Sequence, residues 1–432
     1  MCHRGEGRNG VAEIVGSSSA PSSTTAEQPV GSANRKDRFP ALDGLRAVGA
    51  LAVVTTHAGF HSGESVNGSF AGLLARLDVG VPIFFVVSGY LLYRPHALAR
   101  MTLASPPRMR RYFLHRALRI LPALWIAVLA AYLLLPHDAI GPVEYLYIGG
   151  FVQVYSLRPS VPGLTQMWSL TAEVAFYLLL PLLAAGLAWV PGKPRQWSVR
   201  ASRALLWAVP VSLSWIVWSF LRGEGYQNLW LPAFIGWFGL GMILAVWNVA
   251  RGMGLRKESS LDHLANAPGT CIATAGALYL LMSTRIAGPY DLAATTLTSA
   301  LVKNIGYAAI AGLLVLPAIN PKALRTPFVK HLGTGIAGWL GDISYGIFAY
   351  HLVALGLVEL FLEHEAFGGD FLQLLVGTLV LTIPMAWLSY RFIERPVMML
   401  GRGDTAARPR TAAGRRHVAG ATASAGRSQA KN

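Results

Sequence analysis

The chain has 432 residues, of which 53% are hydrophobic and only 13% are charged, against about 25% charged in an average soluble domain. This composition excludes an intrinsically disordered chain, a coiled coil and a small disulfide-stapled domain. Its two cysteines, Cys2 and Cys271, are too few for a disulfide framework or a cysteine-based metal site. A mean hydropathy of +0.44 over the whole length indicates a protein that crosses a membrane several times.

The two ends of the chain differ from the rest in composition. Residues 1–37 are rich in Ser, Gly, Ala and Thr and lack the apolar run of a signal peptide, which predicts a disordered cytoplasmic tail. Residues 399–432 are rich in Ala, Gly and Arg and predict a second, basic, disordered cytoplasmic tail. Residues 38–398 between them are expected to form one multi-pass membrane domain.

Ten apolar segments are long enough, or nearly so, to cross about 30 Å of hydrocarbon. We therefore expect an all-α integral membrane protein with about ten transmembrane helices. The segments lie near 41–61, 78–93, 120–136, 167–190, 204–221, 229–248, 268–283, 301–318, 340–362 and 371–390.

The positive charges alternate between the two sides of these segments. With the N-terminus inside, 32 of the 37 lysines and arginines fall in the expected inner segments and four fall in outer loops, while Lys303 lies within the eighth segment. Lysine and arginine concentrate in cytoplasmic loops. We therefore expect a protein of the bacterial plasma membrane with both termini on its cytoplasmic side. The same distribution explains the net charge of +16 without a nucleic-acid partner.

The first segment carries a cation and an imidazole on one face. Arg46 and His57 are eleven residues apart, so their side chains differ in direction by only about 20° and in height by about 16.5 Å. An elongated anionic ligand could place its charged end at Arg46 and its reactive end near His57. Asp43, three residues before Arg46, could form an ion pair with it. Two simpler interpretations stay open. Arg46 could be one of the positive charges expected on the cytoplasmic side, and His57 could form a structural hydrogen bond to another helix.

The second segment and the connection after it contain two further candidates. Ser88-Gly89-Tyr90 permits close approach of another helix, and helix packing alone could explain it. Arg116 and Arg119 lie one turn apart at the start of the third segment, and such a pair suits the bidentate binding of phosphates. Lipid headgroups are the other ligand that these arginines could bind.

Ionisable residues also occur in later segments, where each one costs free energy to insert. Glu173 lies near the expected outer end of the fourth segment, so it could share a depth with His57 and orient its imidazole. His351 lies near the middle of the ninth segment, as a pocket residue or a structural one. The sequence from Ser389 to Pro396 reads as the end of the last helix, with Pro396 stopping it and the polar residues anchoring the interface.

The sequence lacks a P-loop, an HExxH pair, a GxSxG turn and any His-rich or Cys-rich cluster. It therefore gives no support for a metal site or for serine hydrolysis. A competing interpretation is a transporter in which His57, Glu173 and His351 relay protons or substrate.

Taken together, these pieces resemble the membrane acyltransferase-3 family, which includes bacterial O-acyltransferases of surface polysaccharides and some antibiotics. The matching stretches occur in order and comprise residues 39–46 with His57, 84–90, 116–122, 168–173 with Phe176 and Tyr177, 343–347 with His351, and 394–396. Many family members that modify polysaccharides carry a fused extracytoplasmic esterase-like domain, whereas this chain ends in a short basic tail.

The resemblance implies transfer of an acyl group, commonly acetyl, from acyl-CoA to a hydroxyl of a sugar, a cell-surface glycan or a secondary metabolite. It implies His57 and Glu173 as catalytic residues, with no permanently bound cofactor. Acyl-CoA is then the donor substrate. Arg46, Arg116 and Arg119 are the expected acyl-CoA-binding residues. The expected pocket or supporting residues are Asp43, Ser88, Gly89, Tyr90, Trp168, Asp342, Tyr345 and His351.

Overall fold

Every regular element in the described ranges is helical, which confirms the all-α prediction. The computed structural model describes residues 39–137, 140–156, 160–223, 225–290 and 294–403. Each of the ten predicted segments lies within or overlaps a helix of the structure. These helices are α1 (Pro40–His61), α4 (Gly80–Thr102), α5 (Met109–Leu134), α7 (Met167–Ala188), α9 (Ala208–Arg222), α10 (Leu231–Gly252), α12 (Pro268–Met282), α13 (Leu297–Ala318), α16 (Ser344–Leu362) and α17 (Phe371–Ser389).

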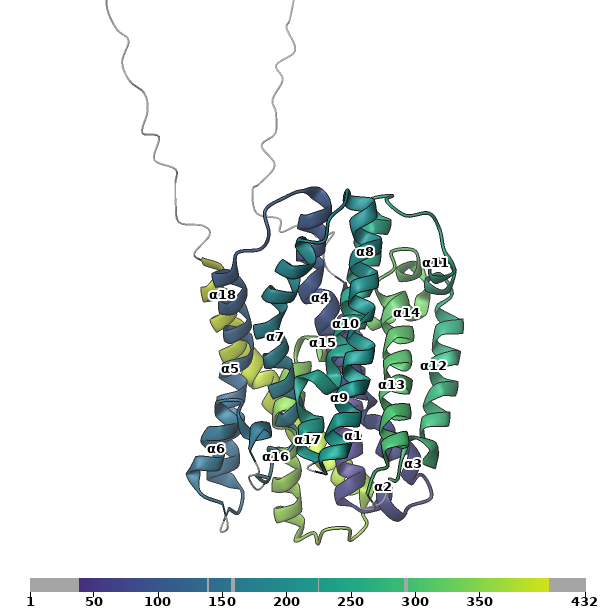
Figure 1. Ribbon diagram of the computed structural model, residues 1–432. Helices are drawn as coiled ribbons and strands as arrows, with labels where there is room; N and C mark the ends of the chain where they lie inside the picture. Colours follow the sequence, from purple (N-terminus) through teal and green to yellow (C-terminus); the bar gives the residue numbers. More distant parts are fainter. Residues whose placement is uncertain (1–38, 138–139, 157–159, 224, 291–293, 404–432) are drawn as a thin grey trace, which may run out of the picture. The chain divides into compact units, whose positions relative to one another are not determined.

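Shorter helices form the connections at the two ends of the long ones. In Figure 1, α8, α11, α14 and α18 lie toward the top, and α2, α3 and α6 lie toward the bottom. Their bounds are α2 (Glu64–Asn67), α3 (Ala71–Ala75), α6 (Pro142–Gly149), α8 (Pro194–Leu206), α11 (Ser260–Ala265), α14 (Pro327–Leu332), α15 (Gly335–Asp342) and α18 (Arg395–Gly403). The 3-10 turns are η2 (Arg76–Val79), η3 (Gln153–Tyr155), η4 (Gly225–Leu229), η5 (Arg285–Ala287) and η6 (Ala323–Arg325).

Within the described residues, eight helical segments are long and apolar enough to cross a membrane. The chain is therefore a multi-pass membrane protein. Two of the ten predicted spans fall outside this group, because α12 has only 15 residues and α1 includes Asp43, Arg46 and His57. The cytoplasmic location of the two termini stays a prediction.

Helices α4 and α10 touch through their main chains. A Cβ atom placed on Gly89 would lie 2.2 Å from the carbonyl oxygen of Phe238, and one on Gly241 would lie 2.1 Å from that of Val86. Only glycine permits this approach, as is common between helices in membranes. Gly89 therefore serves helix packing, in agreement with the simpler interpretation of the Ser88-Gly89 pair.

The Gly89→Ala substitution is expected to destabilise the protein by about 1–3 kcal/mol, because the added methyl group meets main-chain atoms that cannot move alone. Gly186 in α7 is the matched control, since nothing lies within 4 Å of a Cβ placed there. Gly186→Ala should leave stability unchanged or raise it by up to about 1 kcal/mol. Thermal unfolding in detergent measures both, and equal unfolding temperatures for the two variants would contradict this account of the contact.

The last long helix continues past the predicted stop at Pro396. A π-helical turn, Tyr390–Glu394, joins α17 directly to α18. Pro396 lies in the first turn of α18, where the missing N–H of proline costs little, so the prediction that it ends the helix is wrong. Helix α18 runs to Gly403, so the start of the predicted tail at 399–432 is helical. Residues 404–432 and the tail predicted at 1–37 lie outside the described residues.

Candidate active site

A small buried cavity of about 40 Å³ lies among α1, α4, α5, α7 and α16. Each of these helices contributes one residue that the sequence singled out, namely Arg46, Ser88, Arg119, Glu173 and Tyr345. The rest of the lining is mostly apolar. The structure thus brings together five predicted site residues from parts of the chain that lie up to about 300 positions apart.

Hydrogen bonds hold the carboxylate of Glu173 at this cavity. It accepts from the hydroxyl of Ser88 and, at 2.6 Å, from the hydroxyl of Tyr177. Tyr177 follows Glu173 by four residues on α7 and so shares its face, which is the signal that could have placed Tyr177 in the predicted site. The two hydroxyl donors fix the carboxylate in a position where it also interacts electrostatically with Arg46.

The arginines come from the start of α5 and the first half of α1. Arg46 interacts electrostatically with Asp43, Glu173 and Arg119. The guanidinium of Arg116 lies 5.9 Å from the centre of the Tyr177 ring, against the outer side of the cavity wall. Arg46 and Arg119 line the cavity, while their ligands stay a prediction.

Glu394 is a site residue that the sequence analysis did not include. It lies in the π-helical turn with only 3% of its surface exposed, so interfacial anchoring does not describe it. Its carboxylate accepts a 3.0 Å hydrogen bond from Ser389, whose hydroxyl also bonds that of Tyr350. It interacts electrostatically with Arg119 and Arg46, so buried carboxylates compensate the buried guanidinium groups.

His57 lies beside a second imidazole. The ring centres of His57 and His351 are 5.3 Å apart, with the ring planes at 42°. Nδ1 of His351 must carry a proton, because it lies 2.7 Å from the carbonyl oxygen of Phe348, which can only accept. Nε2 of this neutral ring then bears a lone pair, and it is buried without a hydrogen-bond partner among the described residues.

The predicted pairing of Glu173 with His57 is not what the structure shows. Glu173 lines the cavity at the level of Arg46, and His57 lies about 16.5 Å further along α1. The rings of Phe84 and Phe348, 6.2 Å apart, occupy the interval, and Phe348 lies 6.0 Å from His351. The sequence therefore placed Glu173 at the wrong depth, and His351 takes the position beside His57.

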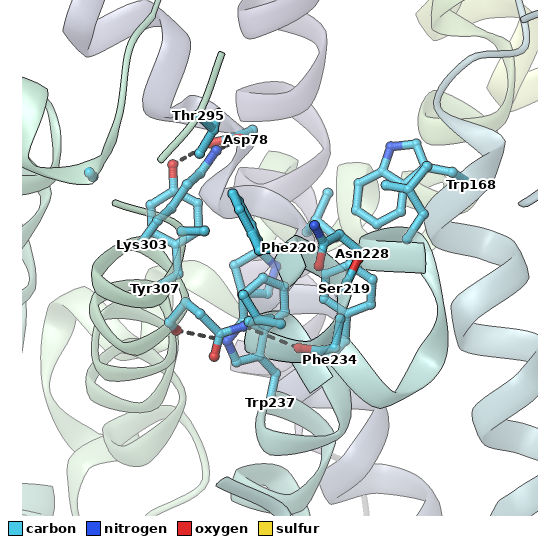
Figure 2. Close-up of a pocket in the computed structure, with 18 of the residues that line it drawn as sticks. Asp78, Trp168, Ser219, Phe220, Asn228, Phe234, Trp237, Thr295, Lys303 and Tyr307 are labelled. Carbon is cyan, nitrogen blue, oxygen red and sulfur yellow. Dashed lines mark hydrogen bonds and ion pairs between the residues drawn. The ribbon is translucent and has the colours of Figure 1, made fainter. Parts of the chain in front are cut away.

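The remaining predicted residues lie outside the small cavity. Tyr90 is fully buried, with its ring 5.2 Å from that of Phe39. Asp342 is exposed at the end of α15. Trp168 lines a different, larger cavity of about 680 Å³, which is shown in Figure 2. Val81 lines both cavities, so the two are neighbours.

Comparison with known proteins assigns the chain to a family. A family profile described as an acyltransferase domain matches residues 39–391, which is most of the chain. The chain belongs to the acyltransferase-3 family. This confirms the resemblance found in the sequence, and the match includes every predicted site residue.

Curated acyltransferases from bacteria are similar to this family member. It is 26% identical over 383 residues to peptidoglycan O-acetyltransferase OatA of Listeria monocytogenes, a match that covers 84% of this chain and 56% of the relative. It is 25% identical over 383 residues to O-acetyltransferase OatA of Staphylococcus aureus, covering 84% and 58%. The chain thus spans little more than half the length of these relatives. No solved structure matches it.

Proposed function

We propose that this chain is an integral-membrane O-acyltransferase that moves an acetyl group from acetyl-CoA to a hydroxyl of a sugar in a cell-surface glycan. Membership of the acyltransferase-3 family supports the reaction class. The names of its relatives, which act on peptidoglycan or as O-acetyltransferases, support acetyl as the group and a glycan as the acceptor. The observation that carries the proposal is the buried cavity in which arginines from α1 and α5 meet Glu173.

The arginines suit the phosphates of a coenzyme A thioester. Arg46, Arg116 and Arg119 gather at the end of α5 that follows the basic connection containing Arg108, Arg110 and Arg111. Guanidinium groups bind phosphates bidentately, and buried ones gain more from such a partner than exposed ones. Without the donor, Asp43, Glu173 and Glu394 balance these charges. The donor would therefore enter from this basic end, and its phosphates would take over some of the arginine contacts that the three carboxylates make without it.

The reactive end of the donor would lie further along α1, near the histidine pair. The interval of about 16.5 Å between Arg46 and His57 suits the pantetheine arm, and Phe84 and Phe348 offer it apolar contacts. His57 then removes the proton from the acceptor hydroxyl while that oxygen attacks the thioester carbonyl. The new C–O bond forms, the C–S bond breaks, and the departing thiolate receives the proton from His57.

His351 is the positioning residue in this scheme. Its Nδ1 is held by the carbonyl of Phe348. In the reacting complex, Nε2 would accept an N–H from His57, whose ring centre lies 5.3 Å from that of His351. A buried acceptor that fixes the tautomer of the base and stabilises its charged form is the arrangement found in catalytic triads. In this family member an imidazole, and not the predicted Glu173, supplies that acceptor.

Substitution of His351 tests this role. His351→Phe should lower kcat by about 10–100-fold, because the base loses its acceptor, and leave the KM for acetyl-CoA unchanged. His351→Gln retains an acceptor oxygen and should recover part of kcat. Steady-state kinetics in proteoliposomes checks both, and equal losses for the two variants would show that His351 serves packing alone.

The proposed function itself is tested by turnover. The purified chain in proteoliposomes should release coenzyme A from labelled acetyl-CoA and acetylate added peptidoglycan glycan fragments. Release of coenzyme A should depend on the acceptor. A chain that consumes no acetyl-CoA, with or without glycan, would contradict the proposal and favour the relay interpretation of His57 and His351.

A further inference from the structure

The larger cavity lies at the opposite end of the helices from the basic connection. Its lining begins at η2 and the first turn of α4, whereas Arg108 and its neighbours follow the last turn of that helix. Residues from α9, α10, α13 and the turns η4 and η5 complete it. Its volume of about 680 Å³ falls within the range of about 300–1,000 Å³ typical of ligand sites.

Aromatic rings form one continuous wall of this cavity. The ring centres of Trp168 and Phe234 lie 5.4 Å apart, those of Phe234 and Trp237 lie 5.2 Å apart, and those of Trp237 and Tyr307 lie 6.5 Å apart. Phe220 of α9 also lines the cavity (Figure 2). Flat aromatic faces offer large, rigid contact area to the C–H faces of sugar rings.

Polar groups face the same space. Asp78 and Lys303 form a 2.6 Å ion pair at one side, and the hydroxyl of Tyr307 donates to Asp78. Both charged side chains keep about a third of their surface exposed, so they remain accessible to a ligand. Arg76, by contrast, is committed to structure, because its guanidinium donates to the carbonyls of Met282, Gly288 and Pro289.

One buried acceptor in the lining lacks a donor. Oδ1 of Asn228 has no hydrogen-bond partner in the part of the chain that the structure describes. Asn228 lines the cavity from η4, the turn that packs against α9 (Figure 2). A buried acceptor without a donor costs free energy, so Oδ1 of Asn228 is available to accept a hydrogen bond from a ligand hydroxyl or N–H.

The two cavities are adjacent. Val81 lines both, and α7 supplies Trp168 to the larger cavity and the next residue, Ser169, to the smaller one. The smaller cavity also borders Phe348, which contacts the histidine pair. A ligand in the larger cavity would therefore lie next to the space in which arginines and histidines are proposed to hold the donor.

We propose that the larger cavity binds the sugar unit whose hydroxyl receives the acyl group. The proposal rests on the proposed function for the identity of the reaction, and on the aromatic wall, the Asp78–Lys303 pair and Asn228 for the class of ligand. Stacking faces combined with ionic and amide hydrogen-bonding groups suit a polyhydroxylated ring better than an apolar metabolite. Lys303, a single lysine within a predicted span, is explained as part of this site.

Binding of a sugar without any donor tests the proposal directly. The probe is a β-linked N-acetylglucosamine tetrasaccharide that carries a photoreactive diazirine, incubated with the whole chain in proteoliposomes. Mass spectrometry should locate the cross-links in peptides that contain Trp168, Phe220 or Trp237. Ala294→Trp places an indole in the lining from an exposed loop position and should weaken binding at least 10-fold. Ala277→Trp, at an exposed position on α12, should bind as the unaltered chain does.

Acetyl-CoA binding, measured in parallel, should be the same in all three proteins. Cross-links outside the cavity, absence of binding by the unaltered chain, or equal binding by Ala294→Trp and Ala277→Trp would overturn the proposal. A chain that cross-links within the cavity and yet never consumes acetyl-CoA would retain the sugar site and refute the proposed function. If Ala294→Trp transfers acetyl groups to the tetrasaccharide with an unchanged KM for it, the proposed function is retained and the sugar site is refuted.

Discussion

The His57→Ala variant is expected to transfer acetyl groups at least about 100-fold more slowly than the unaltered chain, since a positioned general base contributes about 10²–10⁴-fold. Binding of acetyl-CoA should persist, because Arg46, one of the arginines proposed to bind its phosphates, lies about three helical turns away from His57. Single-turnover transfer measures the first effect, and equilibrium binding of labelled acetyl-CoA measures the second.

His263 provides the matched control, because it is exposed on α11, a helix that contributes nothing to the small cavity. His263→Ala should retain full transfer. Near-normal transfer by His57→Ala would show that this imidazole is not the general base. If His57→Ala lost both acetyl-CoA binding and transfer, His57 would instead be needed for the structure of the donor site.

The Arg46→Ala variant is expected to bind acetyl-CoA about 10–100-fold more weakly, because a charge-assisted hydrogen bond contributes about 1.5–3 kcal/mol. It should also lower the unfolding temperature, since Asp43 and Glu173 lose a buried cation. Isothermal titration and thermal unfolding in detergent measure the two effects separately.

A double substitution separates stability from binding. Arg46→Ala combined with Glu173→Gln removes both charges and should regain most of the lost stability, while donor binding stays weak. Arg325→Ala, at an exposed position in η6, controls for the loss of a positive charge. Equal acetyl-CoA affinity in Arg46→Ala and Arg325→Ala would show that Arg46 is not a donor-binding residue.

Much of the fold and half of the site follow from residue types alone. Ten apolar segments each became a helix. Four of the ionisable residues inside them, Arg46, Glu173, His57 and His351, lie between the packed helices beside a cavity or another ring. The relative depth of Glu173 and His57 was beyond sequence reasoning. A segment gives the height of a residue along its own helix, whereas the shift of α7 against α1 depends on how their side chains pack.

Other site residues were hidden for different reasons. Glu394 lies between Arg391 and Arg395, shortly before Pro396, and such a pattern is typical of an exposed helix end. The π-helical turn holds one more residue than an α-helical turn, and the Glu394 carboxylate is buried there. Asp78 and Lys303 are 225 positions apart, so only the packing of η2 against α13 reveals them as a pair. Tyr177, four residues after Glu173, was within reach of the sequence.

The main-chain contact of Gly89 and Gly241 has a consequence for how ligands enter. Helix α4 carries Val81 and Ser88, and helix α10 carries Phe234 and Trp237, so this one pair of helices supplies walls to both cavities. Two backbones in van der Waals contact cannot come closer and have no flexible side chains between them to rearrange. We therefore expect α4 and α10 to keep their relative position when substrates bind, and the movements that admit each substrate to come from the other helices that line its cavity.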